Sequence, residues 1–555
     1  MLLLALLMTV GQVRAGEQVA EALTVDVTPE GFDNVAGIVP TLFPSAIDVP
    51  AQTGAIDLFE GVSLGYSITG LSAAVVVNSA RITPEEGRLH VDADLDIHVN
   101  DADNPFTLAL GGTYYTDLCE GYITEFPVAV AMDIGLAVVT PEDGAPFVDA
   151  TVSEIEATYG LDGSNVHFDE DCILWELNAL LVSDTGYPYP LYDLLIGQLT
   201  APLTATIAEL GPTVETTLED ALAGTVISQD MDLAGGTIHL DLAPGAISIT
   251  PAGMRLTLSG GAAPVSPGEC VAAYDAGPLE RTASAPPDFG TAPKGVATPF
   301  GAGISVSDDF VNEALYAVWR SGVQCLAISD AGGLTLDTSI LGMLTGGVYD
   351  PLFPEAVPLT LRTLPRVSPY ARFDGDHGVT LDLEDFDLEM YAEVDGRQAR
   401  VVTAAVAGPV GADLAFDGAA GTLGLLVDVD PTLFVTSVAY NELYPEQTAT
   451  VEASLATALP GLLATAVEGL TGGLSIAVPG MNGLGVQSLE TGGAGANKDW
   501  LGIYAQIGTV TYATGSGCDG GCGGEGCGGG CASGGPGLVG MMAPLLVALT
   551  LRRRG

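Results

Sequence analysis

The same order of sequence patterns occurs twice along this 555-residue chain. Each half opens with a strand-like run and a short amphipathic helix, at 23–44 and again at 303–322. Alternating runs follow, and each half closes with a long apolar stripe and further strand-like runs. A stretch at 261–300 that is rich in Pro, Gly and Ala separates the two series, which is typical of a linker. The repeat predicts two similar domains, at 20–260 and 301–512.

Residues 88–99 (RLHVDADLDIHV) alternate between polar and apolar side chains along their whole length. Residues 379–390 show a similar alternation in the second half. A period of two predicts antiparallel sheets with one apolar face and one face in water. We therefore interpret the polar residues of the first run as solvated: His90, Asp92, Asp94, Asp96 and His98.

Long helices are predicted near the end of each half. Apolar residues recur at three- and four-residue steps over 191–222 and 451–470, so each helix has one apolar face. Internal prolines in both stripes are expected to kink these helices. At the start of the second half, Ser307 or Asp308 is expected to cap the short helix.

The charge balance excludes one class of partner. The chain has 70 acidic and 16 basic residues, a net charge of −54. Such a surface repels nucleic-acid phosphates and anionic membranes, so we expect no nucleic-acid partner. Because 48% of the residues are hydrophobic, the chain is also too apolar to be a disordered acidic protein.

The N-terminal residues have the pattern of a secretory signal peptide. Residues 1–15 (MLLLALLMTVGQVRA) form an apolar run that ends in a small-residue cleavage site. We therefore expect the protein to be exported.

The C-terminal end has two parts. Residues 513–535 are rich in Gly and Cys, and residues 536–555 hold an apolar stretch that ends in three arginines. The apolar stretch is shorter than the roughly 20 residues that a transmembrane helix needs, so we interpret it as a processed sorting segment. The proposed sorting residues are Cys518, Cys522, Cys527, Cys531, Arg552, Arg553 and Arg554.

This tail resembles the cysteine, hydrophobic helix and arginine-cluster sorting tags of myxobacteria and related bacteria. The resemblance implies export, cleavage of the tail and retention at the bacterial cell surface or outer envelope. The tail would then contact the membrane only before it is processed.

Four further cysteines lie in the body of the chain: Cys119, Cys172, Cys270 and Cys325. An exported chain would oxidise them, and three connectivities are open. We favour Cys119–Cys172 and Cys270–Cys325, because each bond then stays within or near one half.

Patterns for catalysis and metal binding are weak. Residues 61–65 match G-x-S-x-G, but a strand-like run follows where a nucleophile elbow needs a helix. The five histidines lack the spacing of metal ligands. The acids between 92 and 103 suit calcium, yet alternation along a strand explains their spacing, so a solvated face is favoured over structural calcium. We therefore expect no enzymatic activity, no cofactor and no metal site.

Three segments carry a resemblance to a known family: VDVTPEGFDNVAGIVPTLFP (25–44), GISVSDDFVNEALYAVWRSGV (303–323) and 474–507. Together with the order of the patterns, they resemble the family of bactericidal/permeability-increasing protein, lipopolysaccharide-binding protein and cholesteryl ester transfer protein, within the tubular lipid-binding superfamily. The resemblance implies an elongated α+β molecule with two tandem tubular domains, each a long helix wrapped by a curved antiparallel sheet. Cys119 and Cys172 lie where the family's first domain carries its disulfide.

The resemblance implies that an apolar pocket between helix and sheet holds acyl chains. Only 6% of the residues are aromatic, so large side chains that could fill such a tube are scarce. Burying a sixteen-carbon chain is worth about 12 kcal/mol before association costs of about 4–15 kcal/mol. The few cations favour a neutral or zwitterionic lipid. The candidate lipid-binding residues are Val35, Ile38, Val39, Leu42, Leu195, Leu199, Leu203, Ile207, Leu315, Val318, Trp319, Leu455, Leu459 and Leu462.

A second hypothesis comes from a different class. The same apolar stripes would also serve a non-catalytic structural or adhesive cell-surface protein whose cores are filled by their own side chains. The two hypotheses differ in whether the interior leaves room for a lipid or other apolar small molecule.

Overall fold

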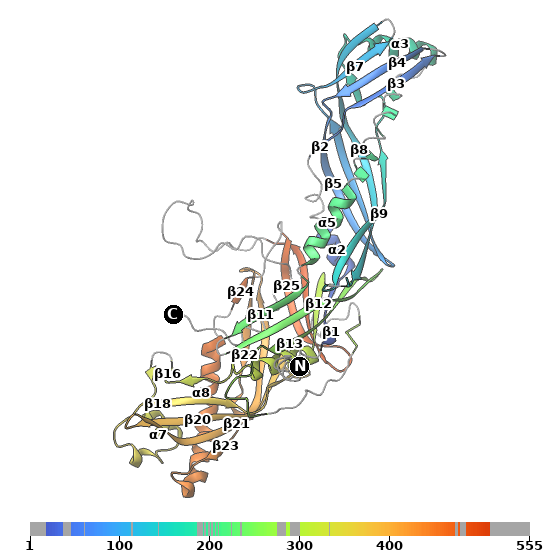
Figure 1. The fold of residues 1–555 in the computed structure, drawn as a ribbon. Helices are drawn as coiled ribbons and strands as arrows, with labels where there is room; N and C mark the ends of the chain where they lie inside the picture. Colours follow the sequence, from blue (N-terminus) through green and yellow to red (C-terminus); the bar gives the residue numbers. More distant parts are fainter. Residues whose placement is uncertain are drawn as a thin grey trace, which may run out of the picture.

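The computed structural model shows an elongated molecule built mostly of strands, with few helices (Figure 1). The sheets are antiparallel and curled, which is consistent with the predicted fold class. The structure describes residues 18–36, 46–59, 62–112, 115–142, 144–185, 210–223, 225–233, 236–274, 285–288, 300–331, 334–471, 475–477 and 484–510, with short pieces between 192 and 208. Residues 1–15 and the tail at 513–555 lie outside this range.

A nine-stranded sheet forms the N-terminal end of the molecule, in the order β2-β5-β6-β8-β7-β4-β3, with β9 and β10 also paired to β8. Its strands are β2 (Ala46–Asp48), β3 (Gln52–Phe59), β4 (Val62–Thr69), β5 (Ser72–Glu85), β6 (Arg88–Val99), β7 (Phe106–Gly112), β8 (Tyr115–Val139), β9 (Phe147–Tyr159) and β10 (Val166–Phe168). The alternation predicted for 88–99 is confirmed, because Leu89, Val91 and every second residue to Val99 are buried in the core.

Among the described residues, the helices that accompany this sheet are α2 (Pro29–Val35), α3 (Ile173–Thr185) and α5 (Leu210–Ala223). The Thr28 side chain caps α2 by accepting a hydrogen bond from the Gly31 amide. The long helix predicted over 191–222 is described as a continuous helix only from Leu210 onward, in α5.

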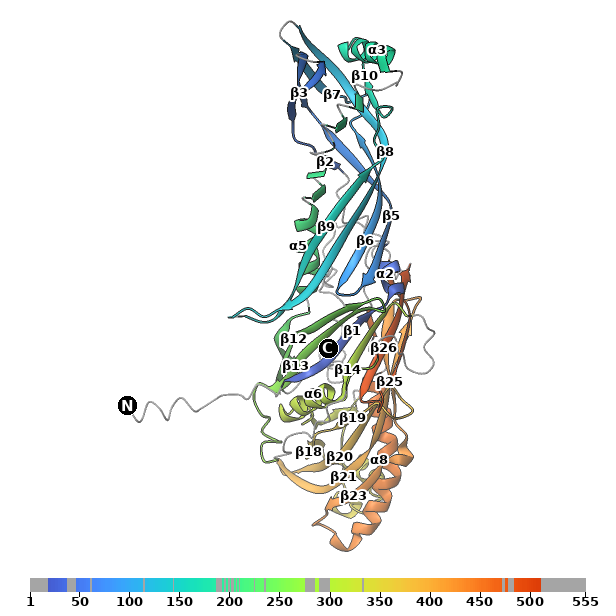
Figure 2. The same cartoon turned by 90° about the vertical axis from the view of Figure 1, so that its right-hand side faces the viewer.

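A central seven-stranded sheet takes strands from both halves of the chain, in the order β11-β12-β13-β1-β14-β26-β25 (Figure 2). Its strands are β1 (Val19–Val27), β11 (Ile227–Leu233), β12 (Gly236–Thr250), β13 (Gly253–Pro264), β14 (Ala302–Ser307), β25 (Leu484–Ala494) and β26 (Trp500–Thr509). Strand β1 pairs with β13 on one side and with β14 on the other. The halves therefore share one sheet, and β13 overlaps the start of the predicted linker.

An eight-stranded sheet forms the C-terminal end, in the order β15-β18-β20-β21-β22-β24, with β19 on β20 and β23 on β21. Its strands are β15 (Ala327–Ile328), β18 (Leu359–Pro365), β19 (Tyr370–Arg372), β20 (Val379–Val394), β21 (Arg397–Asp417), β22 (Thr422–Asp428), β23 (Val435–Tyr440) and β24 (Ser475–Ala477). Between β15 and β18 in the sequence, β16 (Asp330–Ala331) and β17 (Leu334–Thr335) pair with each other as a small separate hairpin.

The second half has three helices: α6 (Asp308–Arg320), α7 (Thr338–Leu344) and α8 (Thr448–Thr471). Short 3₁₀ turns occur at Asp350–Leu352, Pro431–Leu433 and Pro445–Gln447. The predicted cap of α6 is confirmed as Ser307, which accepts a hydrogen bond of 3.2 Å from the Phe310 amide. None of the helices that the structure describes combines the length and the apolar character needed to span a bilayer.

The alternation predicted for 379–390 is interrupted. The β20–β21 register shifts between Leu383 and Phe386, and Asp385 adopts a φ of 43° in this bulge. After the bulge, Phe386 and Leu388 pack in the C-terminal core, so Asp387 between them lies on the opposite face of β20. Its side chain is nevertheless buried there and pairs with Arg366 at 2.5 Å. The expectation of a simple wet face is therefore wrong at this residue.

Both favoured disulfides are present. Cys119–Cys172 joins β8 to the start of α3, and Cys270–Cys325 joins the turns that follow β13 to the segment after α6. Each closes a loop of similar length, with sequence separations of 53 and 55.

Candidate functional site: the seam between α5 and β9

The inner face of the N-terminal sheet is a continuous apolar core. It runs from Phe106 and Leu108 on β7 to Leu89 on β6 and Ile134 on β8, and all four side chains are buried. The core also contains Ile207, which comes from one of the short helical pieces before α5. This is the interior that the sequence predicts for a bound ligand.

The candidate lipid-binding residues fall into different cores. Ile207 lies in the N-terminal core, Leu315 and Val318 in the central core, and Leu455 and Leu459 in the C-terminal core. Their role in binding stays a prediction.

Trp319 is fully buried, and its indole N–H donates to the Pro365 carbonyl at 2.9 Å. Val35 ends α2 and Leu462 lies in α8, but their side chains are outside the described part. Residues outside the described range altogether are Ile38, Val39, Leu42, Leu195, Leu199 and Leu203.

Helix α5 lies along β9, whose strand partner is β8 (Figures 1 and 2). The Val152 amide donates to Glu215 Oε1 at 2.7 Å, and the Ala150 amide donates to Glu219 Oε1 at 3.4 Å. The two carboxylates thereby accept from backbone donors that a further strand would otherwise satisfy. We call this contact the α5–β9 seam, defined by Ala150, Val152, Glu215 and Glu219.

Two further contacts extend the seam toward the tip of the sheet. The hydroxyls of Tyr159 and Thr204 are 3.0 Å apart, and burial raises the pKa of Tyr159 despite this hydrogen bond. At Gly211, an added Cβ would lie 3.0 Å from Ile155 Cδ1, so the helix and the strand approach closely there.

The apolar interior reaches solvent at this seam. Val152 and Ile155 on β9 and Val214 and Leu218 on α5 all pack against the N-terminal core, yet all four are only half-buried. Most residues on the inner faces of β6 and β8 are, in contrast, less than 5% exposed. The seam is thus a place where a molecule in the core and a molecule in solution are separated by few side chains.

A bulge in β9 lies beside the seam. The β8–β9 register shifts between Ala131 and Asp133, and Glu154 adopts a φ of 51°, in the left-handed region that favours glycine. Residues held in this region mark places where the surrounding structure enforces a local conformation.

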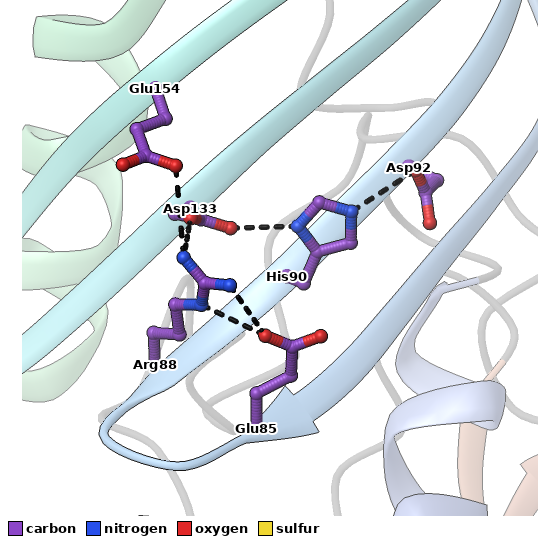
Figure 3. Close-up of polar contacts among 6 residues, drawn as sticks. All are labelled: Glu85, Arg88, His90, Asp92, Asp133 and Glu154. Carbon is purple, nitrogen blue, oxygen red and sulfur yellow. Dashed lines mark hydrogen bonds and ion pairs between the residues drawn. The ribbon is translucent and has the colours of Figure 1, made fainter.

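A network of charged residues lies next to the bulge (Figure 3). Arg88 pairs with Glu85 at 2.8 Å, with the buried Asp133, and with Glu154 at 3.7 Å. His90 Nδ1 lies 2.7 Å from Asp133 Oδ1.

The network corrects one sequence-based interpretation. Asp92 is exposed, as expected, but His90 is half-buried and lies between Asp133 and Asp92, with its Nε2 3.3 Å from Asp92. The hydrogen bond to Asp133 raises the pKa of His90. Burial by itself would raise the pKa of Asp133, but His90 and Arg88 together outweigh burial and lower it.

The same arrangement recurs in the second half. His377 Nδ1 lies 2.8 Å from Asp413, its Nε2 lies 3.5 Å from Asp428, and the bond to Asp413 raises the pKa of His377. Exposed Asp94 accepts a hydrogen bond from Ser79 at 2.7 Å, and half-buried Asp96 accepts one from Asn78 at 2.6 Å.

Elsewhere, neither catalytic nor metal-binding geometry is assembled in the residues described. Ser63 lies within β4, which continues to Thr69, so this serine is not at a strand-to-helix turn. The closest group of metal-ligand types among them is Asp117, Cys119 and Cys172, and both cysteines are in the disulfide. A disulfide sulfur is not a thiolate ligand, so this group does not fit a metal.

An open concavity of about 840 Å³ lies on the same sheet near its tip, between β3, β4, β7 and β8. Its lining includes Gly54, Gly65, Gly111 and the exposed Leu118. It is an open surface feature and is separate from the seam.

Sequence reasoning missed the two carboxylates of the seam. Their spacing, Glu215 and Glu219 on one face of a helix, is visible in the sequence, but the strand that they meet is not. The apolar stripe of the same helix predicts only which of its residues face the core.

No family model and no curated protein matches the sequence. Among solved structures, a lipopolysaccharide binding protein is similar at 15% identity over 89% of this chain and 100% of that chain, with a TM-score of 0.48. P47 of Clostridium botulinum E1 is similar at 7% identity over 88% and 100%, with a TM-score of 0.24. Takeout 1 of Epiphyas postvittana is similar at 11% identity over 35% and 87%, with a TM-score of 0.20.

Proposed function

We propose that this protein binds a lipid or another apolar small molecule inside its N-terminal half. The observation that carries the proposal is the row of half-buried apolar residues at the α5–β9 seam, since these residues are continuous with the buried core. Because these side chains are half-buried, an apolar molecule in solution can contact the edge of the N-terminal core there.

The C-terminal half supports a different role. Nine residues of its core are completely inaccessible to solvent: Leu341, Leu359, Met390, Ala392, Val401, Val402, Ala404, Val451 and Leu455. Side chains that are sealed from solvent in this way fit a core filled by its own residues, as in the structural alternative. We therefore assign binding to the N-terminal half and support to the C-terminal half.

The charge of the protein narrows the ligand class. With a net charge of −54, an anionic head group would be repelled, so the ligand is neutral or zwitterionic. Each buried methylene contributes about 0.8 kcal/mol, so a ligand with two long chains exceeds the cost of association comfortably. No catalytic step is part of this function.

We further propose that the protein is exported and retained at the cell surface. The signal pattern at 1–15 and the tail at 513–555 support this location. The two disulfides support it independently, since such bonds persist in oxidising compartments.

Lipid extraction and mass spectrometry of the purified protein test the binding function. Stoichiometric co-purified lipid, or saturable uptake of a pyrene-labelled phosphatidylcholine by the delipidated protein, is expected. A protein that carries no lipid and takes up none at any salt concentration would instead have the structural role.

A further inference from the structure

The two sides of strand β9 are held by different kinds of bond. On one side β9 pairs with β8 from Val128–Tyr159 to Val139–Phe147, through a backbone ladder. On the other side, side chains of α5 accept hydrogen bonds from the strand. A side-chain contact of this kind parts without disturbing any backbone pairing in the sheet.

The spacing of the seam explains why a helix fits there. Four residues of an α-helix rise about 6.0 Å, and two residues of a strand rise about 6.6–6.8 Å. Glu215 and Glu219 are four apart, and the amides that they bind, Val152 and Ala150, are two apart in the opposite direction. An antiparallel helix therefore presents a carboxylate to each outward amide in turn.

We propose that the α5–β9 seam is the lateral gate through which the apolar ligand enters and leaves the N-terminal core, with Glu215 and Glu219 as positioning residues that hold it closed. This inference rests on the proposed function and adds the route of access. The half-buried Val152, Ile155, Val214 and Leu218 form the apolar lining that a passing chain contacts.

The ends of α5 differ in how firmly they are attached. At the C-terminal end, Leu222 packs against the central core and the Thr225 hydroxyl donates to the Leu222 carbonyl at 2.7 Å. At the other end, the nearest atoms that a Cβ added to Gly211 would meet belong to the side chains of Ile155 and Val152. The helix accordingly pivots near Leu222 and separates from β9 at its N-terminal end.

The closed position is specific. The bulge at Glu154 places Ile155 against Gly211, where no larger residue fits without displacing the side chain. The gate is thus closed by close contact at Gly211 and by two carboxylate–amide bonds further along the helix.

The first test removes the carboxylates. Stopped-flow uptake of a pyrene-labelled phosphatidylcholine, which is zwitterionic, by the delipidated full chain is compared with uptake by Glu215→Ala/Glu219→Ala. Loss of two charge-assisted bonds is expected to raise the uptake and release rates at least tenfold while equilibrium occupancy changes less than twofold. Glu215→Gln/Glu219→Gln keeps an oxygen acceptor at each position and should fall in between.

A matched control uses the other face of the same helix. Asp220 is exposed on α5, so Asp220→Ala removes one charge without touching the seam and should leave the rates unchanged. Rates that respond equally to Asp220→Ala and to the seam variants would overturn the gate, because charge alone would then explain them.

The second test locks the seam. Ala150→Cys/Glu219→Cys is joined by a short bis-maleimide, and the cross-linked peptide is verified by mass spectrometry. Glu219→Cys treated in the same way controls for the other cysteines of the chain. The lock should slow uptake and release at least tenfold, and ligand loaded beforehand should stay bound.

The outcomes separate the two proposals. If the wild type takes up the probe, and neither the cross-link nor the carboxylate substitutions change the rates, the gate is overturned and the binding function still holds. Absence of uptake by the wild type and by all variants would overturn the binding function, and the gate with it.

Discussion

The side chain of Asn312 forms hydrogen bonds with both backbone polar groups of Ala371. The Ala371 amide donates to Asn312 Oδ1 at 2.7 Å, and Asn312 Nδ2 donates to the Ala371 carbonyl at 3.2 Å. Asn312 lies on α6 and Ala371 lies on the short strand β19, and both residues are buried. A helix side chain thus replaces a missing strand here, as at the α5–β9 seam.

Replacing Asn312 should destabilise the protein markedly. Asn312→Ala leaves a buried N–H and a buried C=O without partners, which costs about 1–3 kcal/mol each. We expect a loss of about 2–5 kcal/mol in urea unfolding. Asn78→Ala removes an exposed hydrogen bond to Asp96 and should cost less than about 1 kcal/mol. Equal effects of the two variants would contradict the buried role of Asn312.

The stability contributed by His90 should depend on pH. Because Asp133 raises the pKa of His90 in the folded protein, this contribution is complete below the unfolded pKa of about 6.5 and is lost as the pH rises through the folded value. The wild type should therefore exceed His90→Gln in stability more at pH 5.5 than at pH 8.5. His167, which stacks on Tyr122, provides the control variant His167→Gln. A difference between wild type and His90→Gln that grows with pH would refute the ion pair.

Asp133 should show the opposite dependence. Its pKa is lowered in the folded state, so its contribution is present above the unfolded pKa of about 3.9 and is lost as the pH falls through the folded value. Asp133→Asn should consequently lose most stability near neutral pH, and its unfolding midpoint should approach that of the wild type below pH 3. Thermal unfolding from pH 2.5 to pH 7 measures this, and a constant difference would speak against it.

A large side chain in the seam should block binding. Val214 faces the N-terminal core but is half-buried, so Val214→Trp is expected to fold and to fill part of the interior. We expect at least tenfold weaker binding of the pyrene-labelled phosphatidylcholine. Thr216→Trp places the same ring on the exposed face of α5 and should bind like the wild type. Unchanged binding by Val214→Trp would show that the ligand lies elsewhere.

Loss of either disulfide should have a similar cost. The closed loops have separations of 53 and 55 residues, for which the chain-entropy relation gives about 4 kcal/mol each. Cys119→Ser/Cys172→Ser and Cys270→Ser/Cys325→Ser are compared by urea unfolding. A cost near zero for one pair would mean that its native geometry offsets the entropic gain.

Removal of the C-terminal tail should change the location of the protein and leave its lipid binding unchanged. Deleting 513–555 is expected to release the protein into the medium with unchanged lipid binding, since the proposed gate and interior precede it. Immunoblots of cell and medium fractions measure this. Continued retention of the shortened chain would refute the sorting role.

Short-range patterns in the sequence account for the strands. The alternation of 88–99 became β6 because each apolar side chain there has one inward direction. The bulge in β20 is also visible in the sequence, since apolar residues occupy odd positions up to Leu383 and even positions from Phe386 onward. A regular alternation through 379–390 does not predict this change of face, and it does not predict that Asp387 is buried beside Arg366.

The contacts of the candidate site depend on distant parts of the chain. Glu215 meets Val152 and His90 meets Asp133, and neither pairing follows from residue type or local spacing. Both depend on which strand lies beside which, and that is decided by the packing of the whole sheet. From the sequence alone, a polar residue on the outer face of a strand is therefore predicted to be solvated, because the side chains of the neighbouring strand are not known.

The position of β1 has a consequence for the order in which the molecule is made. Leu23 pairs with Leu258 on one side and with Val306 on the other, so β1, which precedes both partners in the sequence, can complete its pairing only after both have been synthesised. One of its edges stays open until Ala302–Ser307 has been synthesised. The earliest part of the chain is thus among the last to be fully enclosed, and a polypeptide cut at the middle would leave a bare edge on each fragment.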